Sequence, residues 1–279
     1  MSQVPVVPPA PSRSGPVAQD GGVPLHPLPF GVAPPGMKLA FEVEPANRLF
    51  RLRLARYRYQ AGALARLLPA GPVEILDAGC GKGRFPGYWK RWGNPGVHPR
   101  ITGMDISWKR LIGRAKMRGY GVLLAGDLTR PWPYRDGTFD AVLCEQVLEH
   151  LTDAQVRYAL SEAKRVLKPG GVALLGTPVF TEPELWLAPI WTRLNNVLRW
   201  MKGVTEPPHL QHLSVGRLKR LIRGCGLEPE AVQGYRVMSL WYGWGEDWEW
   251  YYRFQQWLGR VVPSLCSEVT VTARKARQD

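Results

Sequence analysis

Short apolar runs that end in an acidic residue, a cysteine or a threonine recur along the middle of the chain. A strand that is covered on both faces of a parallel sheet is apolar at consecutive positions, so these runs predict buried strands at 73–77, 100–105, 121–127, 139–144 and 170–177. Helical patterns separate them, most clearly from Asp153 to Lys168. The alternation predicts an α/β fold with a doubly wound, mostly parallel sheet.

The last part of the chain follows a different pattern. Ala231 to Leu240 and Ser267 to Arg274 predict two strands that pair as an antiparallel hairpin at one edge of the sheet. An aromatic insertion at about 241–262 interrupts them. Acidic residues within it would repel the phosphates of a nucleic acid. Three alternatives remain for this segment: a binding site for a hydrophobic substrate, a dimer contact and a membrane-facing patch.

A glycine-rich turn follows the first predicted strand. The strand ends in Asp77, and glycines stand at 79, 81 and 83. Such a turn lets a ligand lie directly against backbone at the carboxyl end of the sheet, although a purely structural turn has the same pattern. The spacing differs from Gly-x-Gly-x-x-Gly, and a carboxylate beside the turn would repel a pyrophosphate. The turn therefore favours a ligand that is cationic or rich in hydroxyl groups.

Acidic residues also end the next two predicted strands. Asp105 follows 100–104, and an acid at this place in the fold accepts hydrogen bonds from ribose hydroxyls. Ser107 is a suitable N-cap for a helix through Arg118. Asp127 ends the third strand. The segment 93–99 lengthens the distance from Asp77 to Asp105 and is interpreted as a surface insertion.

From Phe41 onward the chain resembles the class I S-adenosylmethionine-dependent methyltransferases of the small-molecule type. The resemblance rests on the order and spacing of five pieces: Leu76-Asp-Ala-Gly-Cys-Gly-Lys-Gly83, Gly103-Met-Asp-Ile106, Gly126-Asp-Leu128, Phe139-Asp-Ala-Val-Leu-Cys-Glu-Gln-Val-Leu-Glu-His-Leu151 and Leu167-Lys-Pro-Gly-Gly171. It implies a Rossmann-like sheet of seven strands, mostly parallel, with an antiparallel C-terminal hairpin and helices on both faces. It also implies S-adenosylmethionine as cofactor.

The resemblance implies a role for each matching residue. Asp77, Gly79, Cys80, Gly81 and Gly83 would line the methionine and sulfonium end of the cofactor. Asp105 would hold the ribose, Ile106 would pack on the adenine, and Asp127 would accept from the adenine amino group beside Leu128. The floor near the reactive methyl would comprise Cys144, Glu145 and Gln146.

A general base is needed only if the acceptor loses a proton, as a hydroxyl does. The candidates are His150, which follows the fourth strand, and His209 and His212, which precede a helix starting near Ser214. For each, a hydrogen-bonded structural histidine is the alternative. The cysteines are scattered without a Cys-x-x-Cys pair, so neither a zinc site nor a disulfide framework is predicted, and a reducing cytoplasm fits.

Composition divides the chain into a tail and a domain. Residues 1–36 are rich in proline and glycine and poor in charge, which predicts a disordered tail. The resemblance implies that 37–279 form the methyltransferase domain. No apolar run is long enough to span a membrane. Residues 181–213 are expected to form a substrate lid. Within it, the apolar stripe Ile190, Leu194, Val197 and Met201, with tryptophans and arginines beside it, predicts either a membrane-interface helix or a lid packed over the pocket.

The formal net charge of +14 suggests an acidic partner, either nucleic acid or an anionic membrane. Arginines at 48, 51, 53, 56 and 58 crowd one helix, as a solvated basic face or as a surface that meets phosphate. The leading hypothesis is methyl transfer to a small or lipid-linked acceptor, with oxygen as the expected acceptor atom. An RNA methyltransferase and a cofactor-binding module without turnover are the alternatives, and the oligomeric state is left open.

Overall fold

The computed structural model describes residues 48–107, 119–180, 210–237 and 249–277. Several expectations lie outside these ranges. They are the tail at 1–36, the helix from Ser107 through Arg118 beyond its first residue, most of the lid with His209, and the first part of the aromatic insertion.

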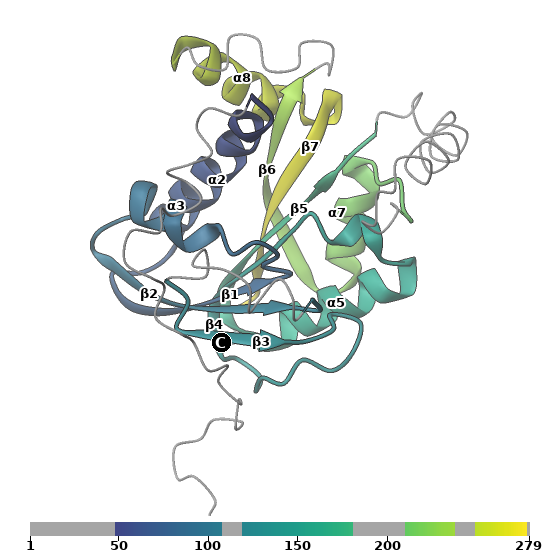
Figure 1. Cartoon of the computed structure of the whole chain (residues 1–279). Helices are drawn as coiled ribbons and strands as arrows, with labels where there is room; N and C mark the ends of the chain where they lie inside the picture. Colours follow the sequence, from purple (N-terminus) through teal and green to yellow (C-terminus); the bar gives the residue numbers. More distant parts are fainter. Residues whose placement is uncertain (1–47, 108–118, 181–209, 238–248, 278–279) are drawn as a thin grey trace, which may run out of the picture.

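The strands form a sheet of 7 strands in the order β3-β2-β1-β4-β5-β7-β6. Strands β1 to β5 are mutually parallel, whereas β7 is antiparallel to both β5 and β6. The predicted doubly wound sheet with an antiparallel C-terminal hairpin is therefore confirmed (Figure 1). The strand bounds are β1 Gly71–Ala78, β2 Val97–Asp105, β3 Val122–Ala125, β4 Phe139–Glu145, β5 Leu167–Pro178, β6 Leu227–Val237 and β7 Cys266–Lys275.

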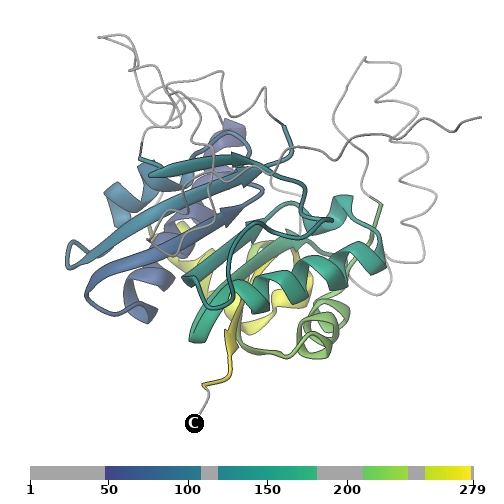
Figure 2. The ribbon, with the colours of Figure 1, turned by 90° about the horizontal axis from the view of Figure 1, so that it is seen from below.

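Helices cover both faces of this sheet (Figure 2). One core packs α2 (Arg48–Leu67) and α3 (Phe85–Trp92) against residues such as Ile75 and Leu143. The other packs α5 (Asp153–Val166) and α7 (Val215–Gly224) against Leu76, Val142 and their neighbours. Consecutive residues of β1 and β4 thus enter opposite cores, which is why their sequences are apolar without interruption.

The helices α5 and α7, which pack on the same face of the sheet, each begin with a side-chain N-cap. Thr152 caps α5 in a capping box, in which its side chain accepts from the Gln155 backbone and the Gln155 side chain accepts from the Thr152 backbone. Ser214 caps α7 by accepting from the backbone N–H of Arg217. Since α5 is the next α-helix after β4 at the carboxyl edge, its N-terminus lies where parallel α/β folds bind ligands.

The interpretation of 93–99 as a surface insertion is wrong for its second half. Strand β2 begins at Val97, and Val97 to Pro99 pair with Gly71 to Val73 of β1. The side chain of Val97 is buried in the core beneath α2 and α3. Pro99 misled the prediction, but β3 pairs with β2 only from Thr102 onward, so a residue without an N–H is tolerated at this open edge.

Helix α8 (Glu249–Val261) and a short 3-10 helix, η3 (Pro263–Leu265), connect β6 to β7. The second part of the aromatic insertion is therefore helical. Among the described residues, no helix is long and apolar enough to cross a membrane.

Candidate functional site

The glycine-rich turn lies between β1 and α3 at the carboxyl edge of the sheet. Gly79, Gly81 and Gly83 have φ angles of 80°, 53° and 62°, in the left-handed region that favours glycine. The backbone N–H groups of Gly79 and Cys80 donate to the carbonyl of Met104 in β2, at 2.7 and 3.1 Å. The turn is thus held against the neighbouring strand.

Gly79 is also required by packing. A Cβ atom at this position would lie 2.4 Å from Cγ2 of Val147, which follows β4. The chain after β4 therefore packs directly on the glycine turn.

Asp105 ties the glycine turn to the end of β2. One carboxylate oxygen accepts from the backbone N–H of Gly81 at 2.8 Å, and the other accepts from that of Ser107 at 2.8 Å. The residue is 5% exposed, whereas the next side chain, Ile106, is 72% exposed. A buried carboxylate beside a bare aliphatic side chain suits a ribose with its attached base.

Asp77 precedes this turn and is buried. Its carboxylate accepts a hydrogen bond from the hydroxyl of Tyr120. Burial raises the pKa of Asp77 to about 7, with the Asp105 charge adding to the rise and the Tyr120 hydrogen bond opposing it. The sequence analysis missed Tyr120, whose only signal was an aromatic residue just before the third strand.

Asp127 follows β3 at the same edge. Its Oδ1 atom accepts from the backbone N–H of Thr129 at 2.9 Å and from the Thr129 hydroxyl at 2.7 Å, while Arg130 lies 3.6 Å from Oδ2. Leu128 is buried, and its carbonyl accepts from the indole of Trp132. The structure thus brings Asp77, Asp105 and Asp127 to neighbouring strand ends.

The three residues predicted to floor the pocket at the end of β4 have different surroundings. Cys144 is buried in the core beneath α5 and α7, and burial raises the pKa of its thiol. Gln146 has a φ of 57° and donates its backbone N–H to the carbonyl of Gly176. Glu145 faces α2 instead, and its carboxylate lies on Gly176, where a Cβ would meet it at 1.7 Å.

Glu145 belongs to a buried polar cluster that the sequence analysis did not predict. Arg56 of α2 is 6% exposed and lies 3.1 Å from a carboxylate oxygen of Glu268 in β7 and 3.9 Å from one of Glu145. The Thr270 hydroxyl donates to Glu145 at 3.0 Å. Burial raises the pKa of Glu145 to about 8, against the opposing effect of Arg56 and hydrogen bonds from Thr270 and Gln60. Neither description of the α2 arginines therefore fits Arg56, which is not on the surface.

The histidine candidates lie around η2 (Leu148–His150) and the segment before α7. The Nε2 atom of His150 is 4.0 Å from a carboxylate oxygen of Glu149. Backbone N–H groups of Leu210 and Gln211 donate to the Glu149 carbonyl, so the structure brings the His150 and His212 segments together.

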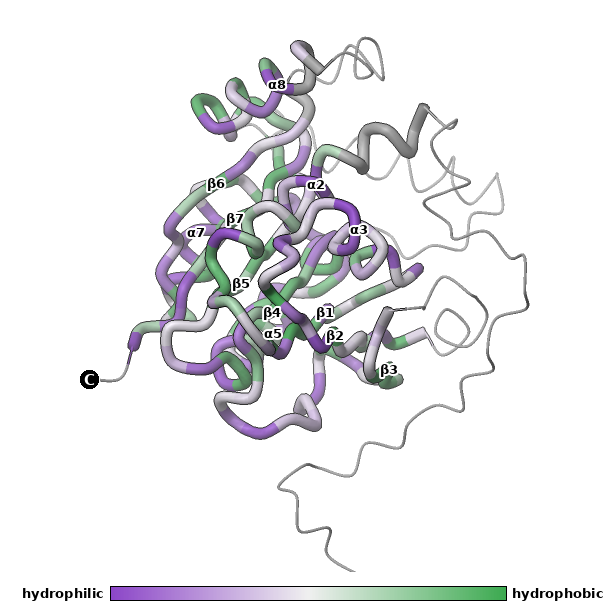
Figure 3. Tube along the Cα trace, turned by 90° about the vertical axis from the view of Figure 1, so that its left-hand side faces the viewer, coloured by the Kyte–Doolittle hydropathy of each residue, from purple (hydrophilic) through white to green (hydrophobic). Residues whose placement is uncertain are grey.

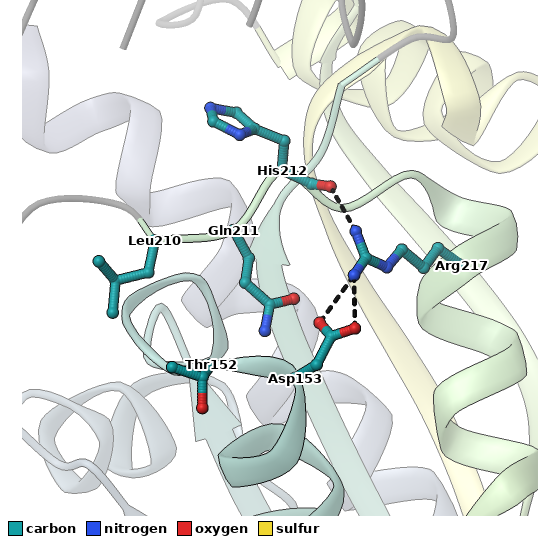
Figure 4. A pocket seen from close by; sticks show the side chains of 6 residues that line it. All are labelled: Thr152, Asp153, Leu210, Gln211, His212 and Arg217. Carbon is teal, nitrogen blue, oxygen red and sulfur yellow. Dashed lines mark hydrogen bonds and ion pairs between the residues drawn. The ribbon is translucent and has the colours of Figure 1, made fainter. Parts of the chain in front are cut away.

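His212 borders an open pocket of about 660 Å³ beside the start of α5 (Figure 4). Its carbonyl accepts from Arg217, which also pairs with both carboxylate oxygens of Asp153 at 2.7 Å. The imidazole points away from that ion pair and packs edge-on against Phe180 at 4.8 Å between ring centroids. Partial burial lowers the pKa of His212, which favours its neutral form.

Glu149 should give the protein a specific pH dependence. The group is 2% exposed, and burial raises its pKa to about 7 against the opposing hydrogen bond from Thr177. Because the folded protein holds this proton more tightly than the unfolded chain, the stability it contributes falls as the pH rises from about 4.5 to about 7. Glu149→Gln should remove this fall, by at most about 3 kcal/mol, since each tenfold change in proton affinity corresponds to about 1.4 kcal/mol.

The measurement is the free energy of unfolding by urea at several pH values between 5 and 8 for both proteins. Loss of the Thr177 contact would shift the Glu149→Gln curve by a constant amount, whereas loss of the titration changes its slope. Parallel curves would contradict the assignment.

Comparison with known proteins agrees with this geometry. A family model described as a methyltransferase domain matches residues 76–175, from β1 through β5. Residues 76–175 thus match a methyltransferase domain. The resemblance to the S-adenosylmethionine-dependent methyltransferases is confirmed for this part of the chain.

Individual relatives differ in how much they share with this methyltransferase domain. A tRNA (carboxymethyluridine(34)-5-O)-methyltransferase of Arabidopsis thaliana is 36% identical over 49% of this chain, which spans only 31% of that protein's length. A ubiquinone biosynthesis O-methyltransferase of Thiobacillus denitrificans is 27% identical over 71% of this chain and 80% of its own length. The solved structure of an S-adenosylmethionine-dependent methyltransferase from Methanosarcina mazei has a TM-score of 0.52 and 18% identity, covering 77% of this chain and 98% of its own.

The residues at the carboxyl edge of the methyltransferase domain fit the family's cofactor. The glycine-rich turn allows the cofactor to approach the backbone, because Gly79, Gly81 and Gly83 have no Cβ atoms. The carboxylates can accept hydrogen bonds from hydroxyl and amino groups, and Ile106 offers an exposed apolar surface to a base.

Proposed function

We propose that this protein transfers a methyl group from S-adenosylmethionine to an oxygen atom of a small or lipid-linked acceptor. The observation that carries the proposal is the arrangement of Asp105, whose carboxylate lies against the N–H of Gly81, with the exposed side chain of Ile106 beside it. This pairing of a fixed acceptor and an apolar surface, next to a glycine-lined turn, suits a nucleoside that carries a charged thioether.

In this proposal each residue of the edge has one role. Asp105 accepts from the ribose hydroxyls, Ile106 packs on the adenine, and Asp127 accepts from the adenine amino group, with Leu128 close by. The methionine and sulfonium end is lined by Asp77, Gly79, Cys80, Gly81 and Gly83. The residues at the carboxyl end of β4, namely Cys144, Glu145 and Gln146, bound the space near the methyl. Bound S-adenosylmethionine supplies an electrophilic methyl group, so the protein's contribution is alignment and exclusion of water.

An oxygen acceptor is supported by the names of the two relatives, each of which is an O-methyltransferase. A hydroxyl acceptor must lose a proton, and His150 is our first candidate to take it, since buried Glu149 lies 4.0 Å from its Nε2 and can stabilise the imidazolium. His209 and His212 remain the other candidates. In this proposal the segment 181–213 closes over the acceptor as a lid; a helix in a membrane interface is the alternative for it.

RNA as the acceptor is the second candidate. The net charge of +14 and the tRNA enzyme among the relatives favour it. It requires binding to RNA whose affinity falls steeply with salt. A protein that binds the cofactor without catalysing methyl transfer is the third candidate. The presence of Asp77, Asp105 and Asp127 argues against it, because the proposed cofactor site has all its carboxylates.

Two measurements test the proposal in sequence. Calorimetric titration with S-adenosylhomocysteine should give saturable heat and a rise in melting temperature. Incubation with S-adenosylmethionine labelled on its methyl group should then move label into organic-extractable material from a cell extract, and not into precipitable RNA. Binding without any transfer would leave only the cofactor-binding module, and label in RNA would replace the leading acceptor class.

A further inference from the structure

Helix α8 carries a stripe of large apolar side chains on the outside of the protein. Trp250, Phe254, Trp257 and Val261 are 63, 46, 57 and 57% exposed, and Leu265 of η3 continues the line at 48%. The spacing of four, three and four residues places them along one face of the helix. Figure 3 shows α8 at the periphery of the molecule, with hydrophobic and hydrophilic positions alternating along it.

The opposite face of α8 fixes this orientation. Gly259 lies about 180° around the helix from the stripe, at about 100° per residue. It packs on β6 so closely that a Cβ would lie 2.0 Å from the carbonyl oxygen of Gly234. Gln233 of β6 donates to the carbonyl of Gln256 and accepts from Nε of Arg260, both at 3.0 Å. The apolar stripe therefore faces outward, because the opposite face of α8, with Gly259, packs on β6.

A basic pocket borders the same stripe. It has a volume of about 390 Å³ and lies between α2 and α8, with Trp92 of α3 at one end. No acidic residue is among the described residues that line it. Four guanidinium groups are, and Trp257 belongs to both the pocket and the stripe; the arginines are Arg58, Arg66, Arg253 and Arg260.

The topology puts this surface at the functional edge of the sheet. Both β6 and β5 are antiparallel to β7, so β6 ends at the same edge as the parallel strands β1 to β5. Helix α8 follows β6 and is therefore at the edge where Asp77 and Asp105 end their strands. In Figure 1, α8 lies beside the end of the β6 arrow.

We propose that α8 docks this protein on the surface of an anionic phospholipid bilayer. The stripe inserts among the acyl chains near the headgroups, and the four-arginine pocket receives lipid phosphate. Tryptophan and phenylalanine on one face, with arginines flanking them, is the composition of a helix that lies in a membrane interface. This surface consists of other residues than the segment 181–213, and it requires no methyl transfer.

Two other occupants fit the surface less well. In a two-fold dimer the stripe would meet itself, and the arginines of both copies would be brought together with their like charges. Single-stranded RNA could stack on Trp257, but Val261 and Leu265 offer no ring for a base. A bilayer satisfies the aliphatic side chains and the cationic pocket together.

The test is co-sedimentation with vesicles of phosphatidylcholine and phosphatidylserine, compared with phosphatidylcholine alone. The wild type should bind the anionic vesicles and not the neutral ones at low salt. Phe254→Ser with Trp257→Ser should weaken binding at least about tenfold by removing buried apolar surface. Arg66→Gln with Arg253→Gln should weaken it about 25-fold, since each basic residue near an anionic surface contributes about fivefold.

A matched control removes the same charge from another helix. Arg220→Gln with Arg223→Gln on α7 should reduce vesicle binding by less than the Arg66 and Arg253 pair does. All three double variants should keep the wild-type melting temperature and affinity for S-adenosylhomocysteine, so failure of docking is distinct from failure of the cofactor site.

Several results would overturn the proposal. The first is equal binding to neutral and anionic vesicles, and the second is no vesicle binding by the wild type. The third is vesicle binding by the α8 variants that equals that of the wild type, which would assign the membrane contact to the segment 181–213 instead. Light scattering that finds a dimer dissolved by Phe254→Ser with Trp257→Ser would assign the stripe to a second copy. Binding of an RNA oligonucleotide, lost with the arginines and unaccompanied by vesicle binding, would assign it to RNA.

Discussion

Replacing Arg56 by methionine should lower the free energy of unfolding by about 3–5 kcal/mol, the usual cost of leaving a buried charge without its partner. Arg56 lies beneath the surface of α2, 3.1 Å from Glu268 of β7. Methionine has a similar length and no charge, so it keeps the packing of the aliphatic part and removes the cation. The carboxylate of Glu268, whose side chain is 13% exposed, would then remain in a poorly solvated site.

Urea unfolding at neutral pH measures this loss. The matched control is Arg223→Met, because Arg223 pairs with Glu228 at the surface, where both side chains are more than half exposed, and such pairs contribute at most about 1 kcal/mol. Adding Glu268→Gln to Arg56→Met should recover part of the stability, since the buried negative charge is then removed together with the cation. An Arg56→Met protein as stable as the Arg223→Met protein would show that the buried ion pair does not form.

Asp105→Ala should weaken the binding of S-adenosylhomocysteine by at least about a hundredfold. The proposed role gives Asp105 two hydrogen bonds to ribose hydroxyls, and bonds to a charged group contribute about 1.5–3 kcal/mol each. The substitution also removes the acceptor for the N–H groups of Gly81 and Ser107, which position the glycine turn. Both effects weaken the binding of the cofactor, whereas the binding of the methyl-accepting substrate is not directly affected.

Calorimetry on the wild type and on Asp105→Ala measures the ratio of dissociation constants. Asp136→Ala is the control, because that carboxylate is 80% exposed and pairs with Arg165, on the helix α5. It should bind the ligand as the wild type does. An unchanged dissociation constant for Asp105→Ala, in a protein with a normal melting temperature, would show that Asp105 does not hold the ribose.

The strands and the position of the site could be predicted because their signals are local. The apolar runs of β1, β4 and β5 reflect burial on both faces, and glycines at 79, 81 and 83 reflect the left-handed φ angles that the turn requires. The incorrect interpretation of 93–99 as a surface insertion also comes from a local signal. Proline and glycine in that segment suggested a loop, whereas pairing with β1 made its second half a strand.

The partners of individual polar groups could not be predicted in this way. Arg56 and Glu268 are 212 positions apart, and Asp77 and Tyr120 are 43 apart. Arg56 belongs to a helix with several other arginines, and nothing in its neighbours distinguishes it as the buried one. The resemblance places Glu145 near the reactive methyl, but its contacts with Arg56 and Thr270 come from distant segments and have no signal in its neighbours along the chain.

By itself the sequence determined the α/β class, the order of the strands along the chain, the glycine turn and the acids that end the strands. Each follows from residues close together along the chain, through side-chain periodicity or backbone conformation. Tertiary structure alone decided that Arg56 is buried, that Tyr120 donates to Asp77, and that the apolar side of α8 faces outward. Such outcomes depend on which distant segments pack together, because a side chain's burial and charge environment are set by neighbours that the local sequence does not contain.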